Sequence, residues 1–322
     1  MNTMVLTKTA DDISSMRIRG AGRIARTAAG ALQEYGTSLD CDTLAAFVRE
    51  MENAADILCG TRPTAVSLPN AVRFVMQGVQ GSTTLEEAQG ALNKRAVEFI
   101  RDSLAAVGKI AEIAARQIPD DAVIMTHCNS EAAIACIIRA HELGKVREVY
   151  ATEVRPRNQG YITIQMLSDA GIPVNFIVDS AARMFMPKVD LVITGTDAVT
   201  ANGAVVNKIG TSQIALCAHE ARKPFIVAAE TYKFAPRTIL GERIPIEYRP
   251  IEEVIGSERQ LPAGVVVKNP AFDVTPPAYV DLIVTEIGAF APSYAPFVIR
   301  DHLGWDTSEF QKDYAFTHHY GE

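Results

Sequence analysis

The chain lacks several features that mark common classes of protein. It has no strongly basic block and no aromatic residues interleaved with cations, and 31 Lys and Arg against 38 Asp and Glu give a net charge of −7. Nucleic-acid binding as the main function is therefore disfavoured. No apolar run approaches the roughly 18 residues of a membrane span, and the first dozen residues lack the apolar core of a secretory signal. We expect a cytoplasmic protein without a nucleic-acid or membrane partner.

The five cysteines form no metal-binding pattern. They include no CxxC pair and no alternation with histidine of the kind that zinc ligands show. In a reducing compartment most of them are expected to be free thiols that pack as small buried residues. We therefore expect neither a metal nor a cofactor.

The 322 residues, 48% of them hydrophobic, are enough for two domains. Up to about residue 118 apolar residues recur at spacings of three and four, which predicts an all-helical N-terminal domain over residues 1–118. The helical stretches cover residues 13–36, 42–60 and 84–118, with a further helix that starts between Thr64 and Leu68.

After residue 119 the period changes to short apolar runs separated by helical segments or turns. Continuous apolar runs that alternate with helices are typical of a parallel sheet covered on both faces. The fold class is therefore α/β: the helical domain is followed by a Rossmann-like domain with a mainly parallel sheet over residues 119–322. Seven runs are candidate strands: 122–127, 148–153, 174–178, 191–197, 225–230, 265–269 and 281–286.

Polar residues gather where these runs end, and the ends of parallel strands are where ligands bind in such sheets. Cys128 lies in "THCNS" between a strand and a helix, where unpaired N–H groups and the helix dipole would favour the thiolate. A small buried cysteine explains the same position equally well. Ser130 belongs to the same strand end.

Asp197 follows the run 191–196, beside the turn-forming "ANG" at 201–203. It is either a turn or capping residue, or a group whose pKa rises near substrate phosphates so that it can donate a proton. In "AVVNKIGT" we expect Asn207 to cap a helix and Lys208 to lie in its first turn. A lysine there opposes the helix dipole, so a bound anion between the two is a good reason for it.

Several further cations lie in loops of this acidic protein. The segment "RIRGAGRIAR" at 17–26 carries four arginines and two glycines, whose backbone N–H groups can meet an anion. Arg62 lies in a proline-bounded loop, Arg155 in "EVRPRNQG", and Lys233 in "AETYKF". A solvated basic surface explains any one of them, but together they describe a cationic cleft.

In order and over nearly the whole chain, the motifs resemble the superfamily of methylthioribose-1-phosphate isomerases and initiation-factor-2B regulatory subunits. The resemblance implies a site between a helical and a Rossmann-like domain that converts an aldose 1-phosphate to a ketose. It implies that Cys128 and Asp197 are catalytic. It further implies that the following residues contact the substrate: Arg19, Gly20, Ala21, Gly22, Arg62, Asn207, Lys208 and Lys233. To these we add Ser130 and Arg155, because each lies at the end of a predicted strand. The motifs that carry it are "RGAG", "TRPTAVSLPNA", "THCNS", "TEVRPRNQG", "DSAAR", "GTDAVTANGAVVNKIGT", "AAETYKF" and "NPAFDVTPP".

Within this superfamily the chain is most similar to the archaeal-type ribose-1,5-bisphosphate isomerases. Methylthioribose-1-phosphate isomerases share the cysteine and the aspartate but usually lack the Lys233 motif, and the translation-factor subunits typically lack the cysteine. The resemblance implies a sugar bisphosphate formed in AMP breakdown as substrate, a product for a bisphosphate carboxylase, and a homo-oligomer built from dimers, with a hexamer as one arrangement. Both rival activities stay open, as does a hydride shift in place of proton transfer through a Cys128 thiolate.

Overall fold

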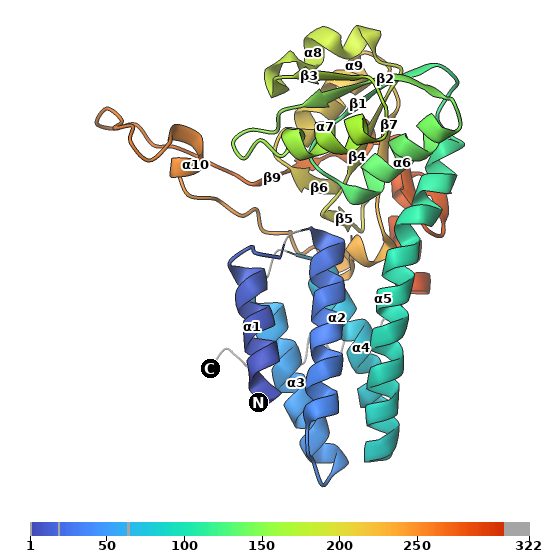
Figure 1. The fold of residues 1–322 in the computed structure, drawn as a ribbon, viewed down its shortest axis with the longest axis vertical. Helices are drawn as coiled ribbons and strands as arrows, with labels where there is room; N and C mark the ends of the chain where they lie inside the picture. The colour runs from blue at the N-terminus through green and yellow to red at the C-terminus, as the bar shows by residue number, and fades with distance from the viewer. Residues whose placement is uncertain (1, 19, 63–64, 306–322) are drawn as a thin grey trace. The chain divides into compact units, whose positions relative to one another are not determined.

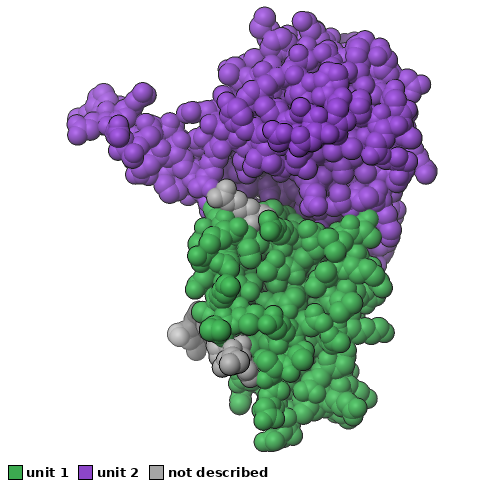
Figure 2. Space-filling view, in the orientation of Figure 1, with its two compact units in different colours: residues 1–106 green, residues 107–322 purple. Residues whose placement is uncertain are grey.

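The computed structural model describes residues 2–18, 20–62 and 65–305 of the chain. These form two compact units, Met1–Ala106 and Val107–Glu322, which Figure 2 colours green and purple. Each unit is described by itself. The helix α5 (Leu85–Ala115) runs through the point at which the units divide, and the domain boundary expected after residue 118 stays a prediction.

The first unit is helical, as predicted. Where the sequence pattern suggested one helix over residues 13–36, the structure has two, because Met16 and Gly20 have positive φ angles of 63° and 87°, which an α-helix cannot contain. Thr43 caps α3, since its hydroxyl accepts a hydrogen bond from Ala46 N at 3.2 Å. The helices are α1 (Asn2–Ser14), α2 (Ala21–Ser38), α3 (Leu44–Gly60), α4 (Ser67–Gln80) and α5 (Leu85–Ala115).

A seven-stranded sheet forms the centre of the second unit (Figure 1). Its order is β11-β10-β7-β4-β1-β2-β3, and all neighbouring pairs are parallel except β10 with β11. Six of the seven predicted runs are strands of this sheet. The strands are β1 (Ala122–Thr126), β2 (Val146–Thr152), β3 (Val174–Ile177), β4 (Leu191–Gly195), β7 (Phe225–Ala228), β10 (Leu282–Thr285) and β11 (Gly288–Phe290).

Both faces of this sheet are covered, which explains the uninterrupted apolar runs. In β7, Phe225 and Val227 belong to one buried cluster, whereas Ile226 and Ala228 belong to another. The first cluster contains α9 and α8 residues, and the second contains α6 and the end of α5. The helices are α6 (Glu131–Glu142), α7 (Gly160–Asp169), α8 (Ala182–Phe185), α9 (Thr211–Glu220), α10 (Glu252–Ile255) and α11 (Ala295–Phe297).

A second sheet of four strands, in the order β8-β5-β6-β9, was missed by the sequence pattern. The predicted strand over residues 265–269 is wrong, because this segment is irregular and Val265 and Val266 are exposed. The strands of the second sheet are β5 (Ala198–Thr200), β6 (Val205–Lys208), β8 (Phe234–Ala235) and β9 (Phe272–Thr275).

Short turns of other helix types complete the second unit. Among the described residues, no helix is both long enough and apolar enough to cross a lipid bilayer. The 3₁₀ turns are η1 (Asp179–Ala181), η2 (Met186–Lys188), η3 (Thr231–Lys233), η4 (Pro236–Leu240), η5 (Pro277–Tyr279) and η6 (Pro292–Tyr294), and a π-helical turn, η7, spans Val298–His302.

Candidate active site

Cys128 and Asp197 follow the two central strands of the main sheet. The chain starts in the middle at β1, adds β2 and β3 on one side, and then adds β4, β7 and β10 on the other. The order therefore reverses between β1 and β4, and the crevice outside the carboxyl ends of these strands is where open α/β sheets bind ligands. Cys128 lies two residues beyond β1 and Asp197 two residues beyond β4. Their positions thus place both residues at this switch point.

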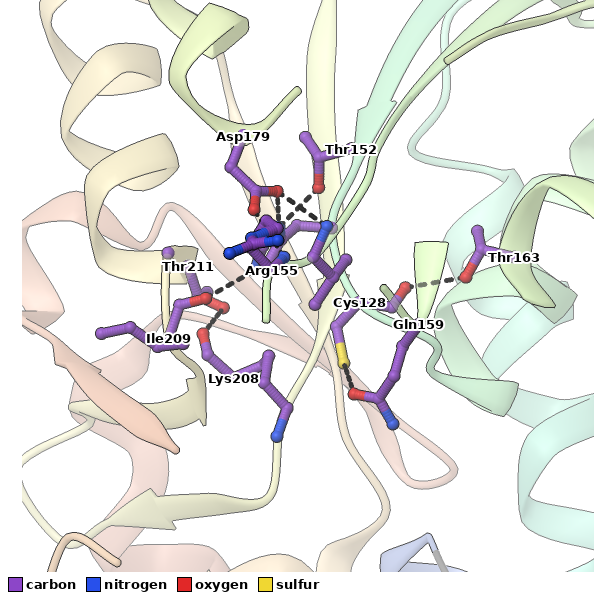
Figure 3. A network of polar contacts seen from close by, with 12 residues as sticks. Cys128, Thr152, Arg155, Gln159, Thr163, Asp179, Lys208, Ile209 and Thr211 are labelled. Carbon is purple, nitrogen blue, oxygen red and sulfur yellow. Dashed lines mark hydrogen bonds and ion pairs between the residues drawn. The ribbon is translucent and has the colours of Figure 1, made fainter. Parts of the chain in front are cut away.

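The Cys128 loop has an unusual backbone. Cys128 has a φ angle of 68°, which is uncommon for a residue with a side chain. The Thr163 hydroxyl donates to the Cys128 carbonyl at 3.0 Å, and the thiol donates to Gln159 Oε1 at 3.6 Å (Figure 3). Gln159 was not singled out from the sequence, although it lies in the "EVRPRNQG" loop; only the fold brings it to the cysteine.

The expectation of a Cys128 thiolate is wrong for the protein without substrate. Loss of hydration on burial raises the pKa of the Cys128 thiol to about 11; Lys208 opposes this rise, whereas the nearby Asp197 carboxylate adds to it. The helix after Cys128 also starts later than expected, at Glu131, with Ser130 as its cap. The resting sulfur is therefore a thiol at neutral pH. The same interactions indicate that Asp197 and Lys208 lie near the sulfur.

Asn207 and Lys208 do not begin a helix, contrary to the prediction. Both belong to β6, and α9 starts at Thr211 after Gly210, whose φ angle is 102°. The buried Asn207 amide donates to the Thr211 hydroxyl at 3.0 Å, and the Lys208 ammonium lies 4.7 Å from the centre of the Phe272 ring. The argument that Lys208 opposes a helix dipole is therefore wrong. Lys208 nevertheless lies close enough to Cys128 to lower the pKa of its thiol.

Backbone N–H groups at the start of α9 already donate hydrogen bonds to a carboxylate from β9. Asp273 accepts hydrogen bonds from Gly210 N at 2.7 Å and Ser212 N at 3.1 Å. Burial nevertheless raises the pKa of Asp273 to about 6, although these N–H groups oppose the rise. The carboxylate thus occupies the helix end that the sequence analysis assigned to an anion.

Lys233 is a buried cation at the end of β7. Its side chain is 7% exposed, and its ammonium lies 2.6 Å from Glu230 Oε2. Burial alone would raise the pKa of Glu230, but Lys233, together with a backbone N–H and the Tyr232 hydroxyl, outweighs that effect and holds the pKa below its ordinary value. Lys233 also favours the Cys128 thiolate through space. A buried, charged lysine at a strand end beside the cysteine suits an anionic ligand.

Ser130 and Arg155 have structural partners. The Ser130 hydroxyl caps α6 by accepting from Ala133 N at 3.3 Å, and it packs so closely against Gly195 that a Cβ there would overlap it. The Arg155 guanidinium donates to Val254 O at 3.2 Å, whereas its backbone N–H donates to Asp179 at 2.7 Å. The substrate roles of both residues stay predictions.

The remaining predicted substrate contacts belong to the first unit. Gly20 precedes α2 with positive φ, and its carbonyl accepts from Ile24 N at 2.9 Å, while Ala21 and Gly22 form the first turn. The Arg62 carbonyl accepts from Ala65 N at 3.0 Å. Arg19 lies outside the described residues. The structure thus groups Cys128, Asp197, Lys208 and Lys233 in the second unit, with Asn207 beside Lys208.

Known proteins match the chain over most of its length. Residues 17–292 match the Initiation factor 2 subunit family. The chain is 50% identical over 301 residues to the ribose 1,5-bisphosphate isomerase of Methanocaldococcus jannaschii, covering 94% of this chain and 96% of that protein. The structure of translation initiation factor eIF-2B from Pyrococcus horikoshii has a TM-score of 0.75 and 31% identity, covering 89% of this chain and 97% of that one. The 5-methylthioribose 1-phosphate isomerase from the same organism has a TM-score of 0.75 and 30% identity, covering 93% and 87%.

Proposed function

Because the chain belongs to the Initiation factor 2 subunit family and is 50% identical over 301 residues to a ribose 1,5-bisphosphate isomerase, we propose that it converts α-D-ribose 1,5-bisphosphate to D-ribulose 1,5-bisphosphate. The observation that carries the proposal is the pair Cys128 and Asp197, each two residues beyond one of the two central strands. A thiol and a carboxylate beside a strand-end crevice are the groups that proton transfer within a sugar requires.

The resting thiol sets the order of proton movements. Asp197 first accepts the proton of Cys128. The protonated Asp197 then donates this proton to the ring oxygen as the bond between that oxygen and C1 breaks. The Cys128 thiolate removes the proton from C2 to give an enol phosphate and returns it to C1, while Asp197 takes the proton of the C2 hydroxyl. The product is a ketose, and both residues regain their starting states once the protonated Asp197 returns its proton to the Cys128 thiolate.

Two phosphates distinguish this substrate from methylthioribose 1-phosphate, which has a thioether in place of the 5-phosphate. A second anion requires an additional donor, and the charged Lys233 beside Cys128 is suited to that role. We further propose that the substrate arises from nucleoside monophosphates such as AMP, that the product feeds a bisphosphate carboxylase, and that the enzyme is a homo-oligomer built from dimers.

Two rival functions make different predictions. A methylthioribose-1-phosphate isomerase would turn over a sugar without a 5-phosphate, and the 30% identity to such an enzyme keeps this rival open. A regulatory subunit like the translation factor would bind a sugar phosphate or nucleotide without catalysis. The presence of both Cys128 and Asp197 favours an enzyme.

One assay on purified protein separates the three functions. Ribose 1,5-bisphosphate and methylthioribose 1-phosphate are offered in turn to the wild type, Cys128→Ser and Asp197→Asn. We expect turnover of the bisphosphate alone, reduced by at least about 10³-fold in each variant, the scale of loss for a group that transfers a proton. Turnover of neither sugar would refute the isomerase. If the reaction is run in deuterated water and the product contains no deuterium at C1, the mechanism is a hydride shift and not a proton transfer through Cys128.

A further inference from the structure

His127 precedes Cys128 and is held by three segments of the second unit. It is 1% exposed. Its Nδ1 lies 2.6 Å from the hydroxyl of Thr152 at the end of β2, and its Nε2 lies 2.9 Å from the carbonyl oxygen of Ile209, which follows β6. Asp179 of η1 approaches Nδ1 to 3.8 Å. Figure 3 labels Thr152, Asp179 and Ile209 in the same network of polar contacts as Cys128. A buried side chain thus joins three loops at the crevice.

The two hydrogen bonds define the tautomer of His127. A carbonyl oxygen can only accept, so the 2.9 Å contact with Ile209 requires the proton on Nε2. Nδ1 then has a lone pair, which accepts from the Thr152 hydroxyl. Burial lowers the pKa of His127, although Asp179 and the Ile209 carbonyl oppose this effect, and Lys208 lowers it further. A neutral imidazole therefore has both nitrogens occupied and is not available as an acid or base.

The bond to Ile209 connects the cysteine loop with the lysine loop. His127 is adjacent to Cys128 in the sequence, and Ile209 is adjacent to Lys208. Gly210 lets the two loops approach, because a Cβ at this position would lie 3.0 Å from His127 Cε1. Its φ angle of 102° is likewise suited to glycine. The hydrogen bond thus ties the backbone next to Cys128 to the backbone next to Lys208.

We infer that His127 is a positioning residue of the isomerase: as the Nε2–H tautomer it fixes Cys128 relative to Lys208. This inference rests on the function proposed above, which assigns the sulfur to proton transfer and the lysine to an anionic group of the substrate. Reacting groups must be held within a fraction of an ångström of their productive geometry, so loosening one loop against the other slows the reaction.

Two substitutions separate the roles of the ring nitrogens. In His127→Gln the amide nitrogen reaches the place of Nε2 and can donate to Ile209, whereas His127→Asn places its amide near Nδ1 and loses that bond. We expect kcat/KM to fall by about tenfold to hundredfold in His127→Asn, the effect of one lost buried hydrogen bond, with KM raised and kcat lowered. His127→Gln should retain activity within a few-fold of the wild type. Equal losses in the two variants would overturn the inference.

A matched control removes general destabilisation as an explanation. Ile137→Val shortens a fully buried side chain of α6 away from the crevice. It should lower the melting temperature without changing KM or kcat. If His127→Asn also lowers the melting temperature but leaves both kinetic constants unchanged, the residue is structural only and the inference is wrong.

Two readouts hold even if neither sugar is turned over. In an NMR spectrum of protein labelled with ¹⁵N-histidine, the two ring-nitrogen signals of His127 are identified as those that disappear in His127→Gln. We expect one of them to come from a protonated Nε2 and the other from an unprotonated Nδ1. Thr152→Ser and Thr152→Val should both retain this tautomer, because the Ile209 carbonyl oxygen still requires the proton on Nε2. Iodoacetamide should modify Cys128 several-fold faster in His127→Asn than in His127→Gln, because water reaches the loosened thiol. A proton on Nδ1, or equal alkylation rates in the two variants, would contradict the proposal independently of the enzyme's substrate.

Discussion

The strands β1 and β7 belong to the same sheet, but the buried titratable groups at their ends differ in charge. At the end of β1, burial lowers the pKa of His127 and raises the pKa of Cys128, so both groups are neutral. At the end of β7, Glu230 and Lys233 are 3% and 6% exposed yet remain charged, because their charged atoms lie 2.6 Å apart. Burial removes a charge unless a partner of opposite sign is supplied at short range.

Removing the partner at β7 should have the largest effect. Glu230→Gln leaves the Lys233 ammonium buried without its carboxylate, so we expect the free energy of unfolding to fall by about 3–5 kcal/mol. Urea unfolding measures this change. The double variant Glu230→Gln, Lys233→Met should recover much of the loss, since it buries no charge. If the single and double variants unfold at the same urea concentration, the pair is not what stabilises this strand end.

Asp273 offers a carboxylate held by backbone N–H groups rather than by an ammonium. Its pKa rises from 3.8 to about 6, so the folded state binds the proton more tightly than the unfolded state. The resulting stabilisation is full below pH 4 and is lost as the pH rises through 6, a change of at most about 3 kcal/mol. Urea unfolding at pH 4 and pH 7 should show this loss in the wild type relative to Asp273→Asn. A difference between the two proteins that does not vary with pH would contradict it.

The protonated thiol at β1 predicts slow chemistry at neutral pH. A pKa of about 11 in place of 9.0 leaves about a hundredfold less thiolate. The rate at which iodoacetamide modifies Cys128 in the unliganded protein should therefore rise tenfold per pH unit from pH 7 to pH 10. Cys128→Ser provides the background from the other four cysteines. A rate that levels off below pH 8 would mean that the thiolate is present at rest.

The smallest effect concerns the glycine beside His127. Gly210→Ala combines an unfavourable positive φ with a Cβ in contact with the imidazole, whereas Gly256→Ala has a φ angle of 78° and open space. We expect both to lower the free energy of unfolding, by about 1–2 kcal/mol for the backbone alone, with Gly210→Ala about 1 kcal/mol worse. Equal losses would indicate that the His127 loop adjusts freely.

Local patterns predicted much of the fold but little of the geometry at the strand ends. Apolar runs identified six strands of the main sheet because both faces are covered, and the helical spacing identified α3, α4 and α5. The placement of Lys208 at a helix start was wrong because β6 pairs with β9, where Asn207 faces Asp273 from far along the chain. No local pattern encodes such a pairing. The protonated state of Cys128 was missed for the same reason, since its burial depends on residues from several loops.

The arrangement of β1 beside β4 also has a consequence for folding kinetics. Val123 N donates to Asp190 across 67 residues, and the intervening strands β2 and β3 lie on the other side of β1. Closing a loop of this length is entropically costly, so this pairing is expected to form after the local helices. The crevice that holds Cys128 and Asp197 exists only once the two strands have met. During refolding, protection of Cys128 from alkylation should therefore coincide with the recovery of the native core rather than with the early gain of helix.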